Sequence, residues 1–210
     1  MKDKLEGKWL NISAGRYYYY PDLIEFDNEN IKRYLIKDFS NNLIITEIRE
    51  EKFDQKISSL IKIDTIEPNR IRIFNKGIKS NVIVGEKTTT TTTDKKAVLE
   101  TDYVKLIPTI SNLTENRIQL LKYELKWNDE KLKIEFNKIL DKPYIQEMNK
   151  KINREGNKIL LEKLDQTLLV SMIDNNKRRL ILPIKDINDT RMILYGFPEK
   201  PYEVEAVRTD

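Results

Sequence analysis

The chain has 210 residues, of which 39% are hydrophobic and 34% are charged, a balance that argues against a disordered chain and against a membrane protein. The 38 basic and 34 acidic residues leave a formal net charge of only +4, which does not indicate nucleic-acid binding. Cysteine and histidine are absent, so disulfides, thiol nucleophiles, Ser-His triads and Cys/His metal sites are excluded.

A Gly-x-Trp motif lies close to the amino terminus, at Gly7 and Trp9. The glycine lets the backbone turn, and the tryptophan stands just before a run of strand formers. The motif therefore predicts that Trp9 lies across one open end of a closing β-sheet.

The first half of the chain contains short runs of β-branched and aromatic residues, separated by turn residues such as those at 27–30, 40–42 and 67–69. This pattern predicts a meander of antiparallel strands rather than βαβ units. The predicted strands are residues 17–26, 31–36, 43–48, 61–64, 70–73, 78–84 and 98–110.

Six consecutive threonines, Thr88 to Thr93, interrupt this meander. The run has no alternation that could select a buried face, so it predicts a mobile hairpin tip rather than a structural strand. A flexible lid over a barrel mouth is the functional alternative.

The second half predicts a strand over residues 117–127, a turn at 128–130 and a return strand over 131–136. One helix is expected near residues 142–154, because Asp141 can cap it, Pro143 fits its first turn and Gly156 ends the apolar pattern. Further strands are predicted at residues 159–173, 180–183 and 192–197, followed by a short extended piece after Pro201.

We expect residues 1–210 to form a single mainly β domain, an antiparallel up-and-down β-barrel with a strand-rich C-terminal extension. Two β-rich lobes, residues 1–115 and 116–210, are the alternative. The segment from Glu6 to Trp9 loosely echoes the one from Glu124 to Trp127, and we interpret this recurrence as chance.

Gly7-Lys8-Trp9 and Thr101-Asp102-Tyr103 together resemble the first two signature motifs of lipocalins, and more closely those of bacterial lipocalin-like proteins. The resemblance implies an eight-stranded barrel around a cavity for a small hydrophobic molecule, with a helix after the eighth strand. It also implies an arginine packed over the motif tryptophan, for which Arg117 is the nearest candidate. In that family these motif residues are structural. The strand-rich residues after the helix depart from the family pattern.

The predicted function is non-enzymatic binding of a small hydrophobic or amphipathic ligand, with the hydroxyls of Tyr17, Tyr19, Tyr103 and Tyr123 orienting it. Alternatively, these aromatic side chains simply fill the core.

A second hypothesis is an intracellular protein-binding module, such as an immunity or inhibitor protein, because dense mixed charge can steer a partner. An enzyme is not favoured, since no nucleophile and base pair can be nominated, and no cofactor or metal is expected.

No apolar run approaches the ~18 residues that a membrane-spanning helix needs. No apolar segment follows the charged start from Met1 to Glu6, so we expect a cytoplasmic protein. A cell-envelope location is the alternative if a leader has been removed. The ligand, the partner and the oligomeric state stay open.

Overall fold

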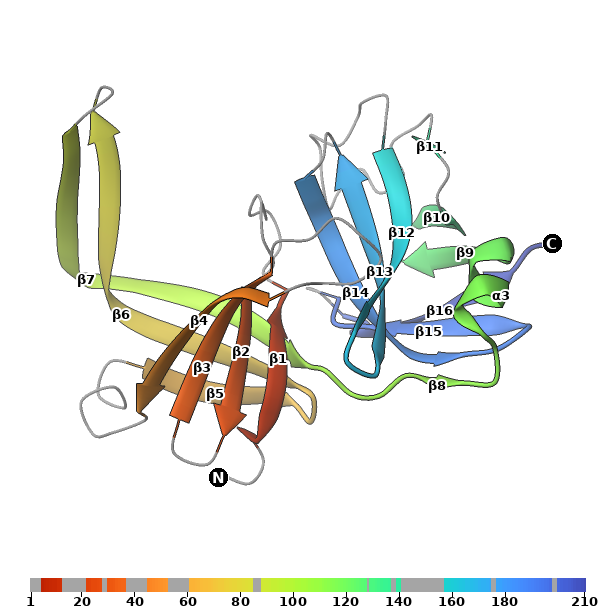
Figure 1. Cartoon of the computed structure of the whole chain (residues 1–210), viewed down its shortest axis with the longest axis horizontal. Coiled ribbons are helices and arrows are strands. Elements are labelled where there is room, and N and C mark those ends of the chain that lie inside the picture. Colours follow the sequence, from red (N-terminus) through yellow and green to blue (C-terminus); the bar gives the residue numbers. More distant parts are fainter. Residues whose placement is uncertain are drawn as a thin grey trace.

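The computed structural model describes residues 5–12, 22–27, 30–36, 45–52, 61–84, 88–127, 129–136, 139–140, 157–174, 177–197 and 200–210. Within these ranges the chain forms two sheets, which lie side by side in Figure 1. The sheets are antiparallel except where one short strand pairs in parallel. The predicted mainly β, antiparallel fold is therefore confirmed. Tyr17, Tyr19 and the helix predicted near residues 142–154 lie outside the described residues.

The N-terminal sheet has seven strands in the described part of the chain, in the order β4-β3-β2-β1-β7-β6-β5. They are β1 (Gly7–Asn11), β2 (Asp22–Asp27), β3 (Asn30–Ile36), β4 (Ile45–Lys52), β5 (Ile61–Glu67), β6 (Arg70–Val84) and β7 (Thr88–Lys105). The first strand pairs with the last, as in an up-and-down barrel. The sheet curls into a half-barrel whose edge strands are β4 and β5, so closure into a lipocalin barrel stays a prediction.

The C-terminal sheet repeats this connectivity, because its strand β9 pairs with the last strand, β16. Its described strands are β8 (Ile110–Ser111), β9 (Lys122–Trp127), β10 (Glu130–Glu135), β11 (Ile139–Leu140), β12 (Asn157–Leu164), β13 (Thr167–Asp174), β14 (Lys177–Ile187), β15 (Arg191–Tyr195) and β16 (Glu203–Arg208). A register shift between Ile184 and Asp186 interrupts the pairing of β14 with β15. Such bulges bend a strand. Strand β14 pairs with β13 before the bulge and with β15 around it.

Two predicted strands differ from the structure. Residues 115–120, at the start of the strand predicted over 117–127, form helix α3 (Glu115–Leu120), because the side chain of Thr114 caps it by accepting a hydrogen bond from the Arg117 amide. The strand predicted over 159–173 is a hairpin of β12 and β13, in which Asp165 takes a left-handed φ of 53°. Aspartate tolerates this conformation better than most residues, so a two-residue turn forms there.

The prediction for the threonine run is also wrong. Thr88 to Thr93 lies in β7 and pairs with β6, in a register that joins Val84 to Thr88 and Lys79 to Thr93. Threonine is β-branched and favours strand geometry. The paired segments Ile78–Val84 and Thr88–Asp94 extend beyond the sheet as a two-stranded ribbon, which we call the arm.

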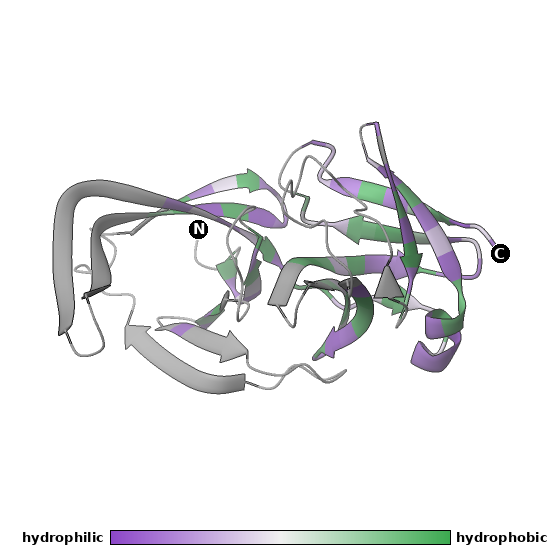
Figure 2. Cartoon of the chain, turned by 90° about the horizontal axis from the view of Figure 1, so that it is seen from above, coloured by the Kyte–Doolittle hydropathy of each residue, from purple (hydrophilic) through white to green (hydrophobic). Residues whose placement is uncertain are grey.

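Side-chain alternation gives the N-terminal sheet two buried faces. Trp9 is paired with Ile24 and points to the concave face, where it joins a core with Phe26, Ile71, Ile73 and Tyr103. Leu10 points the other way, into a second core that also contains residues of the C-terminal sheet. Figure 2 shows the same alternation of hydrophobic and hydrophilic residues along the strands of both sheets.

The C-terminal sheet encloses the largest of the cores formed by the described residues, with members from α3 and from the strands between β9 and β16. Its aromatic residues Trp127 and Phe197 pack with ring centroids 5.3 Å apart. The two sheets thus share a connectivity, but the open concave face belongs to the N-terminal one.

Candidate functional site

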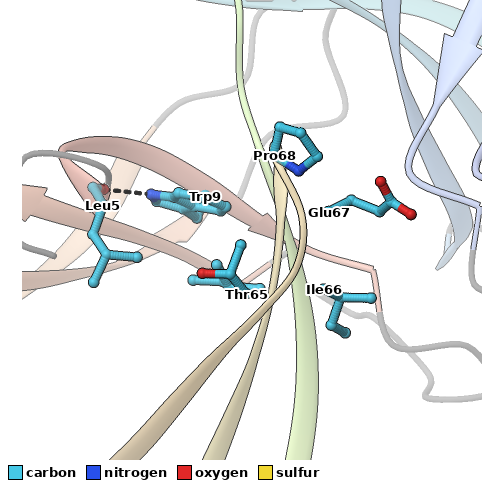
Figure 3. A pocket seen from close by; sticks show the side chains of 7 residues that line it. Leu5, Trp9, Thr65, Ile66, Glu67 and Pro68 are labelled. Carbon is cyan, nitrogen blue, oxygen red and sulfur yellow. Dashed lines mark hydrogen bonds between the residues drawn. The ribbon is translucent and has the colours of Figure 1, made fainter.

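A pocket of about 470 Å³ opens at one end of the concave face, between the start of β1 and the turn that joins β5 to β6 (Figure 3). Its volume lies in the ordinary range for small-molecule sites. The lining residues are Leu5, Trp9, Thr65, Ile66, Glu67, Pro68 and Ile71. Most of them are apolar, and Glu67 is the sole member with a titratable side chain.

Trp9 forms one wall of the pocket and is held in a single orientation. Its indole Nε1 donates a hydrogen bond of 2.7 Å to the backbone oxygen of Leu5, and its side chain is 1% exposed. Because this N–H group already has an acceptor and the residue is almost fully covered, a bound molecule would meet only a small part of the ring's carbon surface. The chain before β1 therefore supplies both Leu5 as lining and the acceptor that fixes Trp9.

The opposite wall comes from β5 and its turn. The pairing of β5 with β6 shifts between Thr65 and Glu67, so Ile66 has no direct partner across the strands. A bulge of this kind re-aims side chains, and Thr65 and Ile66 accordingly both line the pocket although they are neighbours in a strand. In Figure 3 the carboxylate of Glu67 points away from Trp9 and Leu5.

A lysine lies beside the tryptophan wall. Lys105 is paired directly with Trp9 across β7 and β1, and its Nζ is 5.8 Å from the centroid of the indole ring, a cation–π contact. Gly7 makes room for this side chain, because a Cβ at that position would lie 3.3 Å from the Lys105 Cε. The Lys105 amide also donates 2.9 Å to the oxygen of Asn69, in the β5–β6 turn.

Behind the pocket, on the other face of the sheet, lies an ionic cluster of the buried Arg70 and Asp102 with the partly exposed Arg72. Arg70 donates to Asp102 at 2.7 Å, and Arg72 donates to both carboxylate oxygens at 2.6 and 3.0 Å. Burial alone would raise the pKa of Asp102, but the hydrogen bonds from Arg72 and Arg70 outweigh it, and the pKa lies below the ordinary value of 3.8. The carboxylate is therefore ionised at neutral pH.

This cluster also joins the two sheets. Arg70 donates to the backbone oxygen of Phe197, and its guanidinium lies 4.3 Å from the centroid of the Tyr202 ring. Both of these residues belong to the C-terminal part of the chain. Arg70 is 3% exposed, so these contacts are shielded from water and position the sheets rather than contact a ligand.

The predicted ligand-binding tyrosines do not form one group. Tyr103 is 2% exposed and belongs to the concave core with Trp9. Tyr123 lies in β9 of the other sheet, where it donates 2.9 Å to the oxygen of Asn188 and where burial raises its pKa to about 12. Tyr17 and Tyr19 lie outside the described residues. Of the two described tyrosines, Tyr103 shares a core with the pocket residues Trp9 and Ile71, and Tyr123 does not.

The predicted barrel motif is partly assembled. Gly7, Trp9, Thr101 and Asp102 all lie in β1 and β7, which pair with each other. Arg117, the candidate to cover the tryptophan, is instead on α3, where it lies 3.8 Å from a carboxylate oxygen of Asp189. The cation over Trp9 is Lys105.

Sequence reasoning missed most of the lining residues. The sequence predicts a strand that ends at Asp64 and a turn at 67–69, and it assigns no role to Thr65 or Ile66, which the bulge at Ile66 brings to the pocket. A single sequence carries no signal for such a bulge. Within the described ranges, no three His, Cys, Asp or Glu residues are grouped so that they could hold a metal ion. No helix in these ranges is long and apolar enough to cross a membrane.

Comparison of the chain with protein-family models, with curated proteins and with solved structures finds no match. The lipocalin-like interpretation therefore depends on the two motifs and on the curled antiparallel sheet in which they lie.

Proposed function

We propose that this chain is a non-enzymatic binding protein and that the pocket beside Trp9 holds a small hydrophobic or amphipathic ligand. The observation that carries the proposal is the combination of a volume of about 470 Å³ with a lining of indole, aliphatic and proline carbon. Burying an apolar chain against such a surface contributes about 25 cal/mol per Å² of apolar area. We therefore expect a preference for ligands with a flexible alkyl chain.

The composition of the pocket supports binding rather than catalysis. Among the lining residues Glu67 has no second carboxylate beside it, and the hydroxyl of Thr65 has no histidine or lysine in the lining to activate it. Acid–base or covalent catalysis needs a second group within hydrogen-bond reach. A carbon-lined pocket with a satisfied indole N–H instead suits reversible uptake of an apolar chain.

The two tryptophans allow a direct binding test, because they lie in different sheets. In a Trp127→Phe variant, Trp9 is the remaining indole, and titration with 1-decanol should change its emission with a saturable midpoint. In the matched Trp9→Phe variant, Trp127 is buried beside Phe197, and its emission should not respond. A response from Trp127 alone, or from neither indole, would contradict the proposal.

A blocking substitution places the ligand in the pocket itself. Thr65 is an exposed residue of the lining, so Thr65→Phe can put a ring into the pocket without opening a core. We expect at least a tenfold loss of decanol affinity in the Trp127→Phe background. Thr209→Phe, at another exposed threonine, is the control and should leave the affinity unchanged.

A further inference from the structure

Among the described residues of the concave face, one lysine without a carboxylate partner lies beside the pocket. Lys105 and Trp9 are direct cross-strand partners, and directly paired residues of antiparallel strands point to the same face. The Lys105 ammonium therefore lies on the face that contains the pocket, 5.8 Å from the ring that forms the pocket wall. In the part of the chain that the structure describes, this ammonium has no carboxylate within ion-pair distance.

Two other described charged residues near the pocket, Lys8 and Glu67, are paired or turned elsewhere. Lys8, next to Trp9 in β1, contacts Asp165 of the C-terminal sheet at 2.5 Å. The carboxylate of Glu67 points away from Trp9 in Figure 3, and Glu67 is exposed to solvent. Water and salt screen an exposed charge far more than a half-buried one. Lys105 is half-buried, so its charge is screened less than that of the exposed Glu67.

From this arrangement we propose that the pocket prefers an amphipathic monoanion, a single alkyl chain ending in a carboxylate, whose head group pairs with Lys105 beside the Trp9 ring. The alkyl chain would lie against Leu5, Ile66 and Ile71. This inference rests on the proposed function, since it assigns the head group of the same ligand. A charge-assisted hydrogen bond is stronger than one between neutral groups, and in a half-buried site we expect it to be worth about a factor of ten in affinity.

Three probes with the same alkyl chain test the head group: decanoate, 1-decanol and decylammonium, each titrated at pH 7 into the Trp127→Phe variant. We expect decanoate to bind about ten times more tightly than decanol, and decylammonium to bind more weakly than either. Raising the salt concentration should reduce the preference for decanoate, because it screens the ion pair.

Substitution of Lys105 assigns the preference to one side chain. Lys105→Met keeps an unbranched chain over the indole and removes the charge. It should reduce decanoate affinity to that of decanol, within about twofold, while decanol affinity stays constant. Lys8→Met is the matched control in the adjacent strand, and it should leave the preference of about tenfold intact. A circular-dichroism spectrum of each variant verifies that the sheet is retained.

The outcomes separate the two proposals. If decanol binds but decanoate binds no better, or if the preference persists in Lys105→Met, the inference about the head group is wrong and the apolar pocket stands. If decylammonium binds best, the inference is likewise overturned. If none of the three probes binds, the proposed function is contradicted and the head-group assignment is overturned with it.

Discussion

Gly7 lets the chain enter β1 beside the pocket in a conformation that other residues rarely adopt. Its φ of 110° lies where a residue with a Cβ is strained, and the Lys105 chain occupies the space that a Cβ would need. The glycine of the Gly-x-Trp motif therefore permits both the turn into β1 and the close passage of Lys105 beside Trp9.

Gly7→Ala should lower the free energy of unfolding by about 1–2 kcal/mol, because the alanine must adopt a left-handed conformation. Urea denaturation measures the change. In the double variant Gly7→Ala/Lys105→Ala the contact with the lysine chain is gone, yet most of the loss should persist. If the double variant instead recovers the stability of Lys105→Ala alone, the cost comes from crowding and the strain argument fails.

Asp102 links stability to pH through its two arginines. Its pKa is lowered in the folded state, so its contribution is fully present above the unfolded value, near pH 4, and decreases as the pH falls toward the folded value. Asp102→Asn should lower the free energy of unfolding by about 3 kcal/mol at pH 7, because it leaves the buried guanidinium of Arg70 without its anion. The difference in the free energy of unfolding between wild type and variant should become smaller below pH 4. A difference that does not change between pH 6 and pH 2 would contradict this account.

At the scale of elements, the arm is the part of the N-terminal sheet in which only two of the described strands, β6 and β7, pair with each other. Ile61 pairs with Asn75, and beyond that point β6 has β7 as its sole neighbour among the described strands. A two-stranded ribbon is marginally stable by itself, so the arm should contribute little to the stability of the sheet.

Replacing Lys79–Thr93 with Asn-Gly should therefore leave the free energy of unfolding within about 1 kcal/mol of wild type, because this dipeptide closes a hairpin at the Ile78 and Asp94 pair. Decanol binding to Trp9 should be unchanged. A threefold or larger loss of affinity would mean that the arm takes part in the site, as a lid would.

The elements also show what a single sequence can predict. Alternation of apolar and polar residues predicted the paired strands around Ile71, Leu125 and Ile134, because a half-buried strand imprints a period of two. It failed at Thr114 to Leu120, where a capped single turn of helix interrupts strand-like composition. It also missed the two-residue turn at Asp165, which lacks the glycine that usually marks such turns.

The site was less predictable than the fold. Trp9 and Tyr103 were nominated from their types, and both lie in the concave core. The rest of the pocket depends on the bulge at Ile66 and on the pairing of Trp9 with Lys105. The bulge shifts the register of one strand, and the pairing joins two residues that are distant in the sequence. Neither feature leaves a local pattern in the amino-acid sequence.

At the scale of the whole molecule, the two sheets repeat one connectivity and meet across a shared core. Tyr195 is buried there, donates 3.1 Å to the oxygen of Lys105 and accepts 3.1 Å from the amide of Ile107. Thr167 donates to the oxygen of Ile107 at 2.7 Å. The segment that leaves the N-terminal sheet, residues 105–107, is thus hydrogen-bonded directly to the C-terminal sheet. We therefore expect the two sheets to unfold together.

Tyr195→Phe removes both hydrogen bonds of the Tyr195 hydroxyl and should lower the free energy of unfolding by about 1–3 kcal/mol. Unfolding followed through Trp9 and through Trp127, in the two single-tryptophan backgrounds, should coincide in the parent proteins and separate once Tyr195 is replaced. Tyr123→Phe removes one hydrogen bond inside the C-terminal sheet and serves as the control in which the transitions stay together. Separate transitions in the parent proteins would contradict a common unit.

The most direct test of the central claim is a methyl NMR titration of the full chain with 1-decanol. We predict that the methyl signals of Leu5, Ile66 and Ile71 shift with one common saturation curve, while those of Leu125 and Met192 in the C-terminal core stay in place. Shifts confined to the C-terminal core, or no saturable shift at any methyl group, would contradict a ligand site beside Trp9.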